Sequence, residues 1–176
     1  MPWVPARTTR KPRRRLYLTM EAQRDLFDPS SAVNLLSWNR KSTRGCIEAD
    51  LDLWVLGGRV YLNERARFLC RLWPPPPEIW EVRVTEPRPQ IRLFGRFVEP
   101  DTLILTKFHL RDQLGKRESR VWITAMRDCE RKWAALFPAT PPFSASTIHR
   151  YVTENCDDFG PDCPPERTRS RRVRRR

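Results

Sequence analysis

The sequence predicts an α+β fold, a small antiparallel sheet with helices before it and an amphipathic helix after it. Three segments rich in β-forming residues, 79–84, 91–98 and 103–110, follow one another with turn-like connectors between them. Segments with helical periodicity of apolar residues lie before and after them, at 43–55 and 119–137. We expect these helices to pack on one face of the sheet.

The excess positive charge lies at the two ends of the chain. The net charge is +13; residues 1–15 carry six basic groups and no acid, and residues 167–176 carry seven arginines. Residues 16–166 hold 21 basic and 21 acidic groups and are neutral overall. Charged ends of this kind bury little apolar surface. We therefore expect a disordered basic arm at 1–15, a folded domain at 16–138, and a Pro-rich then Arg-rich tail at 139–176 that is mostly disordered.

Both charged ends are candidates for additional contact with nucleic acid or an acidic partner through release of counterions. The alternative is a pair of solvated tails that reflect compositional bias, since 29 of the 34 basic residues are arginine.

The domain begins with a short predicted strand and a predicted helix. Leu16–Met20 is rich in β-forming residues, and the acidic start of 21–28 is typical of a helix N-terminus. Ser30 or Ser31 can cap a further helix that runs through Trp38.

Two more helices are expected before the strands. Ser42 can cap a helix that ends at Gly57-Gly58, a pair of residues typical of helix stops. Asn63 can cap a shorter helix through Leu72, although 59–62 can also be extended, and the prolines at 74–77 must end it.

The three strand candidates are joined by short connectors, 86–89 and 99–101, that contain proline and acidic residues. Such connectors favour tight turns, so an antiparallel meander is the simplest topology.

Ser119 then opens the strongest predicted helix, whose apolar stripe recurs at Trp122, Met126, Cys129 and Trp133. Proline and serine dominate after Pro138, where we expect the packed domain to end, with 148–152 as a weak candidate for a docked segment.

The five cysteines are scattered and odd in number. Cys46, Cys70 and Cys129 lie in apolar-periodic segments, where a free thiol behaves as a small core residue. Neither a signal peptide nor a membrane-spanning run is expected, and a reducing cytoplasm is the consistent location. His149, Cys156 and Cys163 match no usual zinc spacing, so no metal or cofactor is expected.

Signatures of common enzyme classes are missing from the sequence, including a glycine-rich phosphate loop and a nucleophile elbow. The region 82–120 is locally basic instead, with nine Lys or Arg against five acids. Its candidate nucleic-acid-binding residues, with one aromatic residue among them, are Arg83, Phe94, Arg96, Lys116, Arg117 and Arg120.

Strand parity groups the basic residues of this region. Arg92 and Arg96 share one face of their strand, and Lys107 and His109 share one face of theirs. If the helices cover the opposite face, these residues form a shallow basic trough in which Phe94 can stack on an unpaired base. The alternative is a solvated sheet face with salt bridges such as Glu81 to Arg92.

Short motifs in the expected order resemble the RelE/ParE/HigB toxin superfamily, particularly its phage-type, HigB-like branch. They are "IWEVRV" with Trp80-Glu81-Val82-Arg83, "IRLFGRF" with Arg92, and "LILTKF" followed by the basic loop "HLRDQLGK". The resemblance covers roughly residues 60–137.

The resemblance implies a toxin that is neutralised by a cognate antitoxin and cleaves mRNA on the ribosome without a metal, by attack of the 2′-OH on the adjacent phosphate. It implies that Arg92 stabilises the phosphate, that Arg111 lies near the leaving group and that Lys107 or His109 transfers a proton. Arg83, Arg96 and Lys116 would then hold the RNA backbone.

The sequence departs from the family pattern after the loop arginine. Many family nucleases have a tyrosine or histidine there, whereas this chain has Lys116-Arg117-Glu118-Ser119. Two alternatives therefore stay open: a non-catalytic protein on the same fold that binds RNA, DNA or the ribosome, and a ParE-like inhibitor of gyrase.

Overall fold

The computed structural model describes residues 1–5, 10–28, 30–31, 37–38, 41–61, 68–72, 77–86, 88, 90–117, 119–157 and 162–163. Its central element is a six-stranded sheet with the strand order β1-β7-β6-β5-β4-β8. The strands of this sheet are β1 (Arg15–Leu18), β4 (Leu69–Leu72), β5 (Trp80–Val84), β6 (Ile91–Glu99), β7 (Thr102–Leu110) and β8 (Asp162–Cys163). A separate pair of short strands consists of β2 (Ser37–Trp38) and β3 (Lys41–Ser42).

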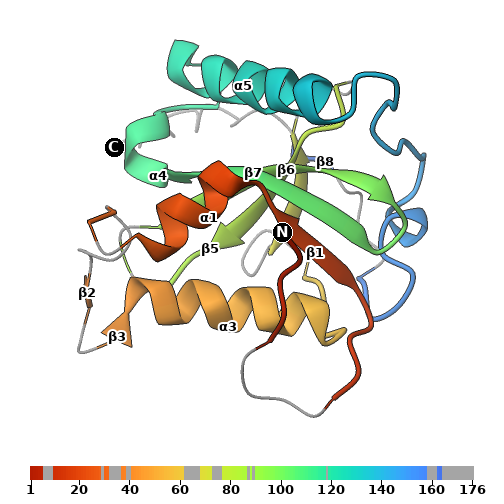
Figure 1. Ribbon diagram of the computed structural model, residues 1–176, viewed down its shortest axis with the longest axis horizontal. Helices are drawn as coiled ribbons and strands as arrows, with labels where there is room; N and C mark the ends of the chain where they lie inside the picture. Colours follow the sequence, from red (N-terminus) through yellow and green to blue (C-terminus); the bar gives the residue numbers. More distant parts are fainter. Residues whose placement is uncertain are drawn as a thin grey trace, which may run out of the picture.

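Helices lie on both sides of the sheet, in three layers (Figure 1). The long helix α5 (Arg120–Leu136) covers one face, and α3 (Thr43–Val55) lies under the other. The shorter helix α1 (Met20–Phe27) follows β1, and α4 (Arg111–Leu114) joins β7 to the loop before α5. The protein is therefore an α+β protein, as predicted, but the expectation that all helices pack on one face is wrong.

The meander β5-β6-β7 is antiparallel in every pairing, which confirms the topology expected from the short connectors. The sheet as a whole is mixed rather than antiparallel, because β1 runs parallel to β7 and β8 runs parallel to β4. A parallel pairing needs a long crossover, and α1 and α3 lie in the segment between β1 and the meander.

A β-bulge in β7 decides which residues face each helix layer. Phe94 pairs with Lys107 but the next residue, Gly95, pairs with Leu105, so Thr106 is the extra residue. The bulge reverses the side-chain parity along β7. Leu105 therefore faces the α3 side of the sheet, whereas Lys107 lies across from Phe94 on the α5 side.

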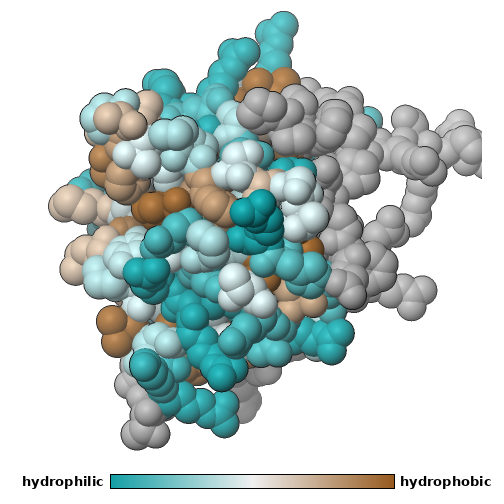
Figure 2. All heavy atoms as spheres, turned by 90° about the vertical axis from the view of Figure 1, so that its right-hand side faces the viewer, coloured by the Kyte–Doolittle hydropathy of each residue, from teal (hydrophilic) through white to brown (hydrophobic). Residues whose placement is uncertain are grey.

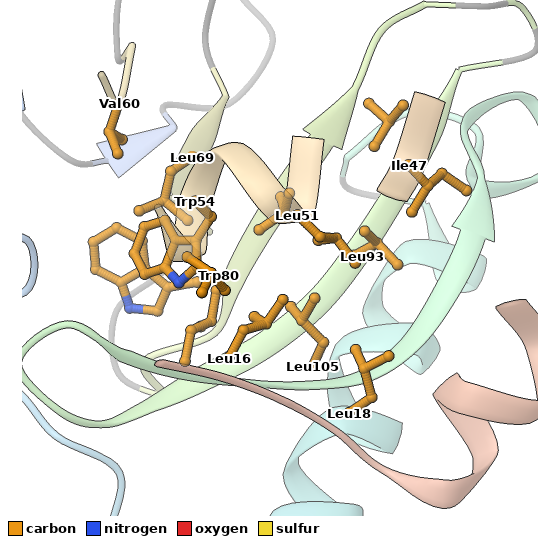
Figure 3. Close-up of a cluster of buried hydrophobic side chains, with 14 of the residues drawn as sticks. Leu16, Leu18, Ile47, Leu51, Trp54, Val60, Leu69, Trp80, Leu93 and Leu105 are labelled. Carbon is orange, nitrogen blue, oxygen red and sulfur yellow. The ribbon is translucent and has the colours of Figure 1, made fainter. Parts of the chain in front are cut away.

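The larger core lies between the sheet and α3 (Figure 3). Ile47, Leu51 and Trp54 of α3 recur at helical spacing and are buried against Trp80 and Leu93 of the sheet. The ring of Trp80 meets that of Phe97 edge-on at 5.1 Å. This packing explains why 43–55 forms the predicted helix.

The smaller core lies between the sheet and α5. Ser119 caps α5 by accepting a hydrogen bond from the backbone N–H of Trp122. Trp122 and Cys129 of the apolar stripe are buried against Phe94, on the face opposite to Leu93. Both faces of β6 are thus covered, including the face that carries Arg92, Phe94 and Arg96, which the alternation of arginine and apolar residues in the sequence did not indicate.

The N-terminal residues are attached to the body rather than forming a disordered arm over 1–15. The backbone of Trp3 donates to Leu16 on the outer edge of β1, and its indole donates to Asp52 of α3 at 2.7 Å. Arg14 is buried, and its guanidinium donates to the carbonyl oxygens of Gly58 and Glu154. The prediction is therefore wrong for residues 1–5 and 10–15.

The packed domain also extends past Pro138, so the predicted boundary at 138 is wrong. Ile148, Tyr151 and Val152 are buried in the larger core, around the short 3-10 helix η1 (Ile148–Arg150). The tyrosine hydroxyl donates to the buried carboxylate of Glu78 at 2.8 Å. These apolar residues recur with neither a helical nor a strand period. The Pro-rich sequence around them therefore gave no signal of a packed segment. Residues 164–176 lie outside the described residues.

Two further local predictions are corrected. Residues 69–72 form a strand rather than a helix, because they pair with β5 in the sheet and all four are buried. Ser37 and Trp38 are extended rather than helical. The remainder of these two predicted helices, 32–36 and 62–67, lies outside the described residues.

Cys70 is also not the free core thiol that the sequence predicted, because it forms a disulfide. Disulfides are uncommon in a reducing cytoplasm. Cys46 and Cys129 are free thiols. Within the described part of the chain, each helix is too short or too polar to cross a membrane.

Candidate nucleic-acid interface

Three arginines converge on one carboxylate, that of Glu81, in the layer between the sheet and α5. The Glu81 side chain has no exposed surface. Its Oε1 accepts hydrogen bonds from Arg83 Nε at 2.5 Å and from Arg117 NH2 at 2.8 Å. Its Oε2 lies 3.5 Å from Nε of Arg92. We call Glu81, Arg83, Arg92 and Arg117 the arginine cluster, which has an excess of positive charge.

The register of the meander places these residues together. Glu81 and Arg83 lie on the α5 side of β5, because Trp80 and Val82 fill the other face. Arg83 pairs with Arg92 of β6, which pairs in turn with His109 of β7, so the three form one row across the sheet. Like charges opposite one another are destabilising, and the Glu81 carboxylate offsets the repulsion between the two arginines.

Arg92 is held firmly inside this layer. Its NH1 donates to the carbonyl oxygen of Ile91 at 2.9 Å, and its NH2 donates to Oε1 of Gln90 at 3.1 Å. Burial lowers the pKa of Arg92 to about 10, while Glu81 opposes that shift. Arg92 thus remains a cation at neutral pH.

The loop between β7 and α5 borders the cluster. The guanidinium of Arg111 lies 5.4 Å from the centre of the Trp122 ring, and that of Arg117 lies 5.8 Å from it. Arg111 also donates to the carbonyl oxygen of Gly115 at 2.5 Å, which fixes the turn after α4. Lys116 is exposed at the tip of this loop. The structure therefore brings Arg83, Arg92, Arg111 and Arg117 together, as the sequence indicated.

An open trough on the α5 side of the sheet, as expected from strand parity, is wrong. Phe94 is fully buried, with ring centroids 5.0 Å from His109 and 5.5 Å from Trp122. The covering helix α5 leaves no exposed ring at this position for a base to stack on. The pair of Glu81 and Arg92, which the sequence suggested as a solvated salt bridge, exists as a buried one.

Lys107 and His109, the two candidates for proton transfer, have different protonation states at neutral pH. Nζ of Lys107 lies 2.9 Å from Oε1 of Glu21 in α1, and this contact raises the pKa of Lys107. Burial, together with the nearby charges of Lys107 and Lys132, lowers the pKa of His109 to about 4. Nε2 of His109 is buried without a hydrogen-bond partner among the described residues. Lys107 is therefore protonated at neutral pH and His109 is neutral.

Two of the predicted nucleic-acid-binding residues lie away from the cluster. Arg96 is buried, donates to the carbonyl oxygen of Pro77, and lies with its guanidinium 5.8 Å from the centre of the Trp133 ring. Its NH2 is 3.9 Å from a carboxylate oxygen of Glu130. Arg120 is exposed at the first position of α5.

The sequence indicated Glu81 only as a partner of Arg92 on a solvated sheet face, and it did not indicate the other residues that arrange the site. Glu81 organises the cluster, Gln90 holds Arg92, Glu21 holds Lys107, and Trp122 lies under Arg111 and Arg117. The available sequence signal for Glu81 was its position two residues before Arg83, which places both side chains on the same face of the strand. The contact from Glu21 depends on tertiary packing that no local pattern encodes.

Three of the five N-terminal basic residues that the structure describes are paired with carboxylates of the same chain. The pairs are Arg13 with Glu154, Arg14 with Asp101 and Arg15 with Glu99. Figure 2 shows the face on the right-hand side of Figure 1, where the coloured part of the surface is largely hydrophilic with separate apolar patches. Among the described residues, no group of three or more His, Cys, Asp or Glu is arranged to hold a metal ion.

No known protein family matches the chain, and neither a curated protein nor a solved structure is detectably similar to it.

Proposed function

We propose that this protein is a RelE/HigB-like toxin that acts on mRNA at the ribosome in the cytoplasm and is neutralised by a cognate antitoxin. The observation that carries the proposal is the arginine cluster, in which three guanidinium groups share one carboxylate. The proposal is also supported by the succession of the antiparallel meander, the basic loop and the last helix along the chain.

The proposed reaction is cleavage by attack of an RNA 2′-OH on the adjacent phosphate. Negative charge develops on the phosphate oxygens, and fixed positive groups in a water-poor layer stabilise such charge effectively. Arg92 and Arg83 would meet the phosphate, and Arg111 and Arg117 would stabilise the leaving side from the loop. Lys107 would donate a proton, because Glu21 keeps it charged, and His109 would accept one as a neutral imidazole.

A second candidate is a non-catalytic protein of the same fold that binds RNA or the ribosome. The burial of His109 favours it, because a histidine with a pKa of about 4 is a weak base at neutral pH. The cluster would then bind phosphate without cleaving it.

Controlled expression in a bacterial host tests the proposal, with growth and mRNA 5′ ends as the measurements. We expect growth arrest and new cleavage sites in frame with the codons of translated messages. Arg92→Ala and Arg92→Lys should abolish both effects, because lysine keeps the charge but loses the planar pair of donors. Arg88→Ala is the matched control, since Arg88 is exposed.

The other outcomes separate the alternatives. Arrest with intact mRNA and DNA damage would identify a gyrase inhibitor. Normal growth with soluble wild-type protein and uncut transcripts would overturn the nuclease. Binding of that protein to ribosomes would then support the second candidate.

A further inference from the structure

The outer face of α5 carries a straight row of arginines. Arg120, Arg127 and Arg131 are separated by seven and four residues, so they lie within about 40° of one another around the helix. Along the axis they are roughly 10 Å and 6 Å apart. All three side chains are exposed. We call these three residues the arginine stripe.

The stripe lies opposite the buried side of α5. Trp122, Met126, Cys129 and Trp133 are buried and hold the helix on the sheet. They lie about 180° around the helix axis from the arginines. Figure 1 shows α5 as the outermost layer on its side of the sheet. The stripe is therefore held straight by a rigid, well-packed helix and is turned to solvent.

The stripe also differs from the other arginine-rich part of the fold in how its charges are neutralised. Arg13, Arg14 and Arg15 are each paired with a carboxylate elsewhere in the chain. Arg120 and Arg127 form no ion pair with a described residue, and Arg131 forms one, with Asp128 of the same helix. The N-terminal arginines therefore form ion pairs within the fold, whereas most of the positive charge of the arginine stripe is available to bind a partner.

We infer that the arginine stripe is a docking surface for the sugar-phosphate backbone of duplex RNA. Arginine guanidinium groups bind phosphate oxygens in pairs, and a duplex presents rows of phosphates at regular spacing. Duplex RNA is recognised mainly by its shape and backbone, which suits a row of charges without base-reading groups.

An acidic protein is the less suitable partner. Stable protein interfaces need large apolar anchors near their centre. The exposed large apolar residues of α5 are Val121 and Ile123 near its start and Leu136 at its end, so the stretch with Arg127 and Arg131 has none. The inference rests on the proposed function, because the ribosome presents RNA duplexes on its surface.

The test compares two full-length variants with the same net charge. One is Arg120→Gln/Arg127→Gln/Arg131→Gln, and the control is Arg24→Gln/Arg88→Gln/Arg150→Gln, whose arginines are exposed on other elements. Binding to a 20-base-pair RNA duplex of mixed sequence is measured by fluorescence anisotropy at several salt concentrations. Circular dichroism checks that both variants are folded.

We expect the stripe variant to lose at least tenfold in affinity at 100 mM salt and to reduce the slope of log K against log salt by about two. The control should lose less than threefold. Equal losses in both variants would overturn the inference, because net charge alone would then explain the binding. Unchanged binding in the stripe variant, or preference for an acidic peptide over the duplex, would also overturn it.

The two experiments distinguish a failure of the docking surface from a failure of the proposed nuclease function. If Arg92→Ala abolishes growth arrest but the stripe variant binds duplex RNA normally, the proposed function stands and the stripe has no such role. If the stripe variant loses duplex binding while the wild type neither arrests growth nor cuts mRNA, the docking surface stands and the nuclease does not.

Discussion

Arg92 and Glu81 lie on neighbouring strands with Nε of the arginine 3.5 Å from Oε2 of the glutamate, and both side chains are buried. Removing charged groups from water costs free energy, and this cost is offset only when each group keeps its ion-pair and hydrogen-bond partners. The same carboxylate also holds Arg83 and Arg117. The arrangement that concentrates positive charge around Glu81 therefore also makes the fold depend on one acidic residue.

Replacing Glu81 with Gln should lower the free energy of unfolding by about 3–5 kcal/mol, because it leaves buried guanidinium groups without their carboxylate. Urea denaturation of the purified protein measures the change. Glu99→Gln is the control, since its pair with Arg15 is largely exposed and should contribute about 1 kcal/mol or less. A loss at Glu81 no larger than the loss at Glu99 would contradict this account of the cluster.

His109 should make the protein less stable in mild acid. Its pKa is about 4 in the folded protein and about 6.5 in an unfolded chain, so the unfolded state binds the proton more readily. The contribution of His109 is complete above pH 6.5 and is lost as the pH falls towards 4, by up to about 3 kcal/mol. The free energy of unfolding of His109→Gln should change less than that of the wild type between pH 7 and pH 4.5. Parallel curves for the two proteins would show that His109 titrates normally.

A chain that ends at Pro138 should not fold cooperatively. It lacks Ile148, Tyr151 and Val152, whose burial in the larger core contributes about 1.5–3 kcal/mol each. A chain that ends at Cys163 keeps these residues and should melt within a few degrees of the full-length protein. Thermal denaturation followed by circular dichroism compares the two. A sharp transition in the shorter chain would restore the domain boundary at 138.

Gly95→Ala should be destabilising in spite of its small size. A Cβ at this position would lie 2.2 Å from the carbonyl oxygen of Ile104 in β7, beside the bulge. The strands must separate to admit it, at a cost of about 1–3 kcal/mol or more. Chemical denaturation is the measurement, and a change below 0.5 kcal/mol would mean that the strands lie further apart than described.

The sequence was informative where a pattern is local. The three strands of the meander were predicted within two residues at their ends, and the helix of 43–55 was predicted together with its stop. Turn composition and side-chain period are sufficient for such elements, because each depends on a few neighbouring residues.

The sequence was uninformative where the structure depends on contacts between distant segments. Strand parity grouped Arg92 with Arg96 but did not reveal that α5 would cover that face, so Phe94 was expected to be exposed. Tyr151 contacts Trp80 and Phe97 from a Pro-rich segment without any period. An arginine on a strand is compatible with water or with a buried partner, and the choice between them is made by the whole fold.

The pairing of β1 with β7 has a consequence for biosynthesis. Leu16 lies beside Leu103, so the first strand finds its partner only after most of the domain has left the ribosome. Because a ribosome adds about 5–20 residues per second, the apolar sides of α1 and α3 stay uncovered for seconds. The nascent chain therefore exposes these apolar sides until β7 has emerged, and Arg92 of β6 and Arg117 of the loop after β7 can join Glu81 only at that stage.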